Sequence, residues 1–116
     1  MNAGNEVVGP PDEDVDVVVE VFRMLADPTR VRLLLALGER ELSVNELAEL
    51  VGKPAPAVSQ HLAKLRLARL VQTRREGVKI FYRLENQHVM RLVTDAVHHA
   101  DHLGPGTPRH HREEPA

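Results

Sequence analysis

The chain has 116 residues, a formal net charge of −2 and no cysteine. Its length predicts a single domain, and the lack of cysteine excludes disulfides and thiolate metal sites. No run approaches the roughly 20 apolar residues of a membrane span, and no signal-peptide pattern is visible at the N-terminus, so we expect a cytoplasmic protein without membrane contacts.

The first 13 residues are acidic and contain Gly9-Pro10-Pro11, which predicts a disordered arm, residues 1–13, before a folded domain, residues 14–103. A helix is expected from about Asp14 to Ala26. The reason is that apolar residues recur there at helical spacing, namely Val15, Val18, Val19, Phe22 and Leu25.

A second helix is expected to begin directly after the first. Asp27 suits the N-cap and Pro28 the first helical position, where a missing N–H costs nothing. Gly38 is the expected end of this helix. Its residues are apolar nearly all round, which predicts that it forms the buried centre of the domain.

Two further helices are predicted in close succession. Ser43 and Glu46 have the spacing of a capping box, so a helix begins there and ends at Gly52. Pro54 and Pro56 then set a tight turn and start the next helix, about residues 56–68. The buried stripe of that helix is predicted to be Val58, Leu62 and Leu65.

A basic hairpin follows, with strands over Val71–Arg75 and Lys79–Arg83. Residues 53–83 carry eight basic side chains and one acidic one. In residues 1–20, by contrast, all charged side chains are acidic. Helix, turn, helix and basic hairpin in this order predict a winged helix-turn-helix, a mainly α fold with a β-hairpin wing. The expected partner is double-stranded DNA.

The second helix of this motif carries the side chains expected to read DNA. Ser59, Gln60 and His61 lie early in that helix, where recognition helices contact bases, and Gln pairs well with adenine. The basic residues expected on phosphates are Lys64, Arg66, Arg74, Arg75 and Lys79. In the alternative interpretation, Ser59 and His61 only cap or pack locally and the basic residues are a solvated surface.

A last helix is predicted from about Asn86 to His102, followed by a His-containing tail, residues 104–116. His99 and His102 share one helix face. His88 lies on that face too, but eleven residues away, which is about 16 Å along the axis. One metal ion cannot bridge that distance within one helix. Antiparallel pairing with a second chain would bring His88 of one chain to His99 and His102 of the other, which predicts a homodimer through the terminal helices with two interfacial sites.

These motifs resemble the ArsR/SmtB family of metal-sensing repressors. The resemblance extends from about Phe22 to His102 and is strongest at residues 25–33, 58–62, 70–71 and 77–82. It implies a homodimeric winged helix that binds operator DNA and releases it when an effector binds. Asn86 stands where many members have Asp and is expected to cap the last helix, so the usual four-ligand zinc site is not expected.

The chain is also similar to the nickel/cobalt sensors of this family, including residues 52–56 and 108–112. That resemblance implies that the metal ligands are His88, Asp101, His102, His110 and His111, with Asp101 one methylene shorter than the Glu of the pattern. Imidazoles with a carboxylate suit Ni(II), Co(II) and Zn(II), and more than four ligands favour a six-coordinate ion.

The sequence therefore predicts a transcriptional repressor released from DNA by Ni(II) or Co(II). A zinc-responsive repressor and a metal-independent winged-helix regulator are the alternatives. An enzyme is not expected, because we find no paired nucleophile and base, and a full set of ligands leaves no open catalytic position on a metal.

Overall fold

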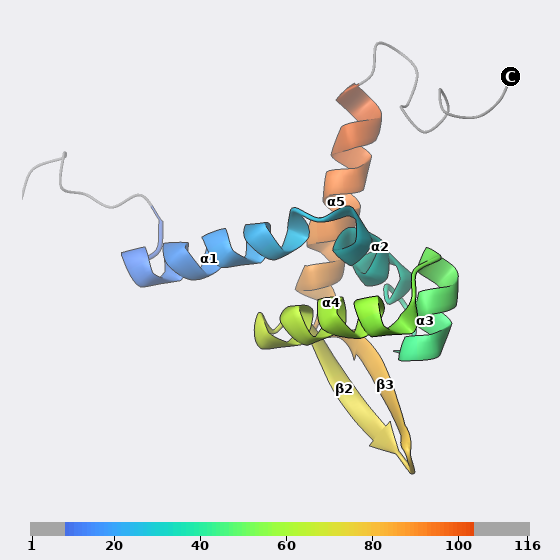
Figure 1. The fold of residues 1–116 in the computed structure, drawn as a ribbon. Coiled ribbons are helices and arrows are strands. Elements are labelled where there is room, and N and C mark those ends of the chain that lie inside the picture. The colour runs from blue at the N-terminus through green and yellow to red at the C-terminus, as the bar shows by residue number, and fades with distance from the viewer. Residues whose placement is uncertain (1–8, 104–116) are drawn as a thin grey trace, which may run out of the picture.

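The computed structural model describes residues 9–103, which form five helices and one small antiparallel sheet (Figure 1). This confirms the expected fold class, mainly α with a hairpin wing. The elements are α1 (Asp12–Leu25), α2 (Pro28–Ala36), β1 (Leu42–Ser43), α3 (Val44–Val51), α4 (Ala55–Leu67), β2 (Val71–Glu76), β3 (Lys79–Leu84) and α5 (Gln87–Leu103).

Side-chain caps fix the starts of three helices as the sequence predicted. Asp27 Oδ2 accepts the N–H of Arg30 at 2.9 Å at the start of α2. Ser43 and Glu46 form the complete capping box of α3, with bonds of 2.9 and 3.2 Å. Asn86 Oδ1 accepts the N–H groups of the first residues of α5. Each cap satisfies backbone donors that have no partner within the helix.

Two helix ends differ from the expectation. α1 begins at Asp12 rather than Asp14, so the last two residues assigned to the arm are helical; acids in its first turn stabilise that end through the helix dipole. Gly38 follows α2 but does not adopt a left-handed conformation. An added Cβ at Gly38 would lie 3.2 Å from the carbonyl oxygen of Leu35, so close approach to the preceding turn favours glycine there.

The sheet contains a strand that the sequence did not reveal. β1 has two residues, and Leu42 and Ser43 pair with Tyr82 and Phe81 of β3. The strand order is β1-β3-β2, so β3 is central and connects the wing to the start of α3. Tyr82, which pairs with Leu42 and Thr73, is half-buried and packs against the core.

The core is entirely aliphatic among its fully buried residues. α2 supplies its centre and α3, α4 and β2 surround it; the largest fully buried side chains are Leu33, Leu34, Leu37, Leu47, Val58, Leu62, Leu65 and Val71. Val89 and Val93 attach α5 to this core. The stripe predicted for α4 and the central place of α2 are therefore confirmed.

Much of the apolar face of α1 is left uncovered within residues 9–103, although Val21, Met24 and Leu25 pack partly against the core. α1 contains no buried residue, and Phe22 is 55% exposed. Figure 1 shows α1 and the end of α5 projecting from the body of the domain. No helix within residues 9–103 has the length and apolar character required to cross a bilayer. An amphipathic helix with an uncovered apolar face requires a partner surface.

We expect Asp27→Ala to lower the free energy of unfolding by about 1 kcal/mol, because α2 loses its N-cap. Asp27→Asn, which also caps, is the matched control and should cost much less. The hydrogen bond from the Arg30 N–H lowers the pKa of Asp27 despite partial burial, and the positive charge of the Arg30 guanidinium acts in the same direction. This stabilisation is complete above the ordinary Asp pKa and is lost as pH falls through the lower folded-state pKa. Urea unfolding at several pH values checks this. The difference in the free energy of unfolding between wild type and Asp27→Asn should shrink as the pH falls and vanish at low pH.

Candidate DNA interface and metal-binding helix

The exposed face of α4 carries most of the side chains predicted to read DNA. Val58, Leu62 and Leu65 turn inward, which leaves Ser59, Gln60, Lys64 and Arg66 exposed. In Figure 1, α4 lies across the domain and the hairpin of β2 and β3 extends beyond it. The candidates for base reading and for phosphate binding therefore lie on α4 and on the hairpin that follows it.

His61 differs from its neighbours because it is half-buried and held by α2. Its Nδ1 lies 3.3 Å from Nη1 of Arg30 and 3.9 Å from Oδ2 of Asp27. A guanidinium only donates hydrogen bonds, so the Nδ1 of a neutral His61 must accept and the proton must be on Nε2. Arg30 thereby sets the tautomer in which the other ring nitrogen is a donor.

Arg30 is a site residue that sequence reasoning missed. Besides His61, it donates through Nε to the carbonyl oxygen of Met24, at the end of α1, over 2.7 Å. It lies 31 residues before His61, and no local spacing signals this contact. One side chain thus joins the end of α1 to the recognition helix.

The basic residues of the wing fall into two kinds. Arg74 donates to Glu41 at 2.8 Å and to Glu76 at 3.0 Å, and its guanidinium lies 5.0 Å from the centre of the Phe81 ring. Hydrogen bonds to Glu41 and then Glu76 raise the pKa of Arg74. Arg75 and Lys79 are exposed, and within the described residues neither has an ion pair. The charge of Arg74 is therefore compensated within the fold, whereas Arg75 and Lys79 remain available to a phosphate.

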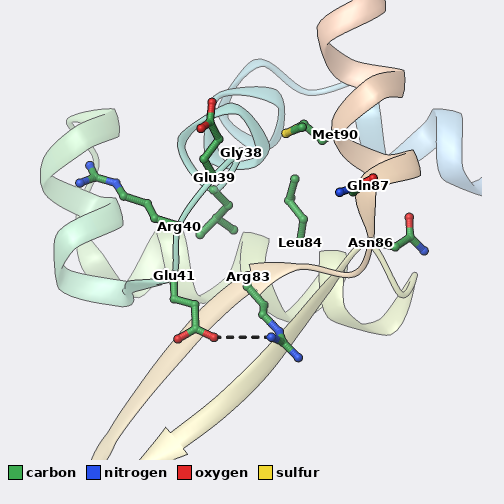
Figure 2. Close-up of a pocket in the computed structure, with 10 residues that line it drawn as sticks. Gly38, Glu39, Arg40, Glu41, Arg83, Leu84, Asn86, Gln87 and Met90 are labelled. Carbon is green, nitrogen blue, oxygen red and sulfur yellow. Dashed lines mark ion pairs between the residues drawn. The ribbon is translucent and has the colours of Figure 1, made fainter.

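A hollow of about 440 Å³ marks the joint between the wing, the segment that follows α2, and α5 (Figure 2). Arg83, near the end of β3, lies 3.9 Å from Glu41 across this hollow and donates to Gln72 at 3.0 Å. Only Glu85 and Asn86 separate β3 from α5. The wing and α5 are thus joined by a connection of only two residues, which leaves little slack between them.

The predicted metal ligands of the described chain all lie on α5. His88, His99 and His102 are exposed, and Asp101 is half-buried. Nη2 of Arg91 donates to Nδ1 of His88 at 3.1 Å. Within residues 9–103, no three His, Cys, Asp or Glu side chains are gathered as a metal site requires. His110 and His111 lie outside the described residues.

An apolar groove lies beside this helix, between α1 and α5. Its volume is about 340 Å³, and its lining is almost wholly apolar, from Phe22, Leu25, Val31, Leu92, Ala96 and Val97 among others. Leu92 follows His88 by one turn, so the groove adjoins the histidine face of α5. Any segment that covers the groove also approaches the histidines.

Residues 27–73 match the model of the arsR family of bacterial regulatory proteins. The chain is 72% identical over 102 residues to the HTH-type transcriptional regulator KmtR of Mycobacterium tuberculosis, covering 88% of this chain and 78% of that protein. It is 42% identical to the HTH-type transcriptional repressor SmtB of the same species, covering 78% of this chain and 67% of SmtB.

The fold matches solved structures of the same kind. One is the homodimeric winged helix-turn-helix DNA-binding domain of a possible ArsR-family regulator from Mycobacterium bovis, with a TM-score of 0.73 and 30% identity. That match covers 84% of this chain and 94% of the other. HlyU from Vibrio cholerae matches with a TM-score of 0.70 and 32% identity, over 76% of this chain and 96% of HlyU.

Proposed function

The chain belongs to the ArsR family of bacterial transcription regulators, and we propose that it is a homodimeric repressor that leaves its operator DNA on binding Ni(II) or Co(II). Its relatives and its fold are those of DNA-binding regulators and not of enzymes. The observation that carries the metal response is the separation of the histidines on α5 beside an uncovered apolar groove.

The groove between α1 and α5 supports the homodimer. Apolar area buried on association stabilises by roughly 25 cal/mol per Å² before the costs of association. Phe22 and Val97 are more exposed than is usual for apolar residues on the face of a helix that packs, at 55% and 38%. The same helices of a second copy present a matching apolar surface, as a two-fold symmetric interface requires.

The chemistry of the donors fits the proposed ions. Imidazole nitrogens with a carboxylate and no thiolate suit Ni(II) and Co(II). Because His88 is about 16 Å along the helix from His99, an ion held by histidines from both positions needs the antiparallel α5 of a second chain. Asp101, His102 and the tail residues His110 and His111 complete the proposed set.

Arg91 opposes metal binding at His88. It donates to Nδ1, so a neutral His88 carries its proton on Nε2, and neither nitrogen offers a free lone pair. Binding an ion through either nitrogen therefore breaks the contact with Arg91 or rearranges it. On metal binding, His88 would give up its contact with the Arg91 guanidinium and take the metal ion in its place.

Release of DNA follows from the joint between α5 and the wing. Metal ions bound between histidines of the two α5 helices would fix the relative position of these helices. The spacing of the two α4 helices and of the two wings would then be fixed as well. Dimers read half-sites about 34 Å apart, so a changed spacing weakens binding. A coupling free energy of about 1–3 kcal/mol corresponds to a 5–150-fold loss of DNA affinity.

A zinc-responsive repressor is the second candidate, because imidazole and carboxylate also bind Zn(II). The absorption spectrum of the Co(II) complex distinguishes the two proposals, since six-coordinate and four-coordinate ions differ strongly in intensity. In a metal-independent regulator, none of the three ions would change DNA affinity in a mobility-shift titration.

We expect Gln60→Ala and His61→Ala to weaken binding to the operator far more than binding to random DNA. A good base contact contributes about 1–3 kcal/mol of discrimination. His98→Ala, an exposed histidine on α5, is the matched control and should change neither affinity. Competition titrations measure both constants, and equal losses on operator and random DNA would exclude base reading.

Arg75→Ala should flatten the salt dependence of DNA binding. Each lost phosphate contact lowers the log–log slope by about 0.9, and a homodimer loses two. Arg74→Ala should change the slope less, because Glu41 and Glu76 already compensate that charge. Anisotropy titrations across a salt series provide the slopes, and identical slopes for Arg75→Ala and wild type would remove this residue from the interface.

A heterodimer tests whether the metal sites are shared between chains. One chain carries His88→Ala and the other His102→Ala. Shared sites leave one site intact and one doubly damaged, so we expect about one tightly bound Ni(II) per dimer by equilibrium dialysis. Sites within single chains would both be damaged, and tight binding would vanish.

Two controls accompany this measurement. Each variant as a homodimer should lose tight binding at both sites yet still bind operator without metal. A heterodimer with His98→Ala in place of His102→Ala should retain one site, because His98 is turned about 100° from His99 around the helix.

A further inference from the structure

Helix α4 ends in a backbone conformation that normally requires glycine. The N–H of Arg69 bonds to the carbonyl of Arg66 at 3.0 Å, and the N–H of Leu70 bonds to that of Leu65 at 2.9 Å. These two bonds form a Schellman motif, which places its second-last residue in the left-handed region. Arg69 accordingly has φ 60°.

The chain itself shows what is usual at such positions. Every other residue of the described range with a left-handed φ is glycine: Gly9, Gly52 and Gly77. Gly52 ends α3 in the corresponding place. A side chain with a Cβ is disfavoured in this conformation, so an arginine here incurs a conformational cost that glycine avoids.

The fold does not compensate this cost. The Arg69 side chain is exposed and has no hydrogen bond or ion pair with any residue in the range 9–103. Backbone strain that brings no internal contact indicates a role toward an external partner. The charge of Arg69 indicates that this partner is an anion.

The surroundings of Arg69 favour a nucleic-acid phosphate as that anion. Arg66 and Arg69 line a surface hollow of about 760 Å³ between α4 and β2, with Gln72 and Thr73 on its other side and Glu85 as its only acid. The hollow continues the exposed face of α4, since Ala63 and Leu67 also line it. Leu67 lies about 10 Å beyond Gln60 along the helix, close to the major-groove width of about 12 Å. When Gln60 reaches a base, the end of α4 therefore reaches the phosphates at the edge of the groove.

We propose that Arg69 is a phosphate-contacting residue of the DNA interface, held in place by the strained end of the recognition helix. This inference rests on the DNA binding proposed above and adds a residue to it. The contact is independent of base sequence and of metal.

The test uses the metal-free full chain and a random-sequence duplex, with binding followed by fluorescence anisotropy over a salt series. Arg69→Asn and Arg69→Gly remove the charge and suit the left-handed conformation, so both variants should fold with a melting temperature no lower than wild type. Both should lower the slope by about 1.8 per dimer. Between about 50 and 200 mM salt, the ratio of wild-type to variant affinity should then fall about 12-fold. Arg69→Lys should keep the slope, because it keeps the charge.

Arg32→Asn is the matched control, since Arg32 is an exposed, unpaired arginine of α2, and its slope should equal that of wild type. The proposal is overturned if Arg69→Asn also keeps the wild-type slope, or if Arg69→Lys loses it. A lower melting temperature for Arg69→Gly would assign the side chain a role in the fold and overturn the proposal as well. If wild type itself does not bind DNA, the proposed function fails along with this inference.

Discussion

The guanidinium of Arg30, a residue of α2, contacts both neighbouring helices through one planar group. Its Nε donates to the end of α1 and its Nη1 meets His61 of the recognition helix, while the backbone N–H of Arg30 bonds to Asp27. Arg30 is therefore a direct polar link between α1 and α4, in addition to the apolar core that holds α4. Since α1 carries the uncovered apolar face, the proposed dimer interface and the proposed DNA face share this connection.

Several features were predictable because their signals are local. A cap is specified by residues three positions apart, so Asp27, the capping box of α3 and Asn86 were all visible in the sequence. The inward stripe of α4 follows from helical periodicity in the same way. These signals sufficed for the order of the elements and the class of fold.

What the sequence did not reveal depends on contacts distant along the chain. β1 has two residues and exists only because β3, about 40 residues later, accepts it as a neighbour. Arg74 was grouped with free basic residues because Glu41 lies 33 residues before it. His61 was expected on the open face of α4, yet Arg30 draws its ring toward α2. The metal-binding set stays a proposal for the same reason, since it requires atoms of a second chain.

The position of Tyr82 in the central strand has a spectroscopic consequence. It is the only tyrosine of the chain, and there is no tryptophan. Its ring packs against the core at the place where β3 passes from the wing to the short connection with α5. The intrinsic ultraviolet emission of the protein therefore comes from one phenol located where the wing joins the body. That emission reports the attachment of the wing without any introduced dye and without background from an indole.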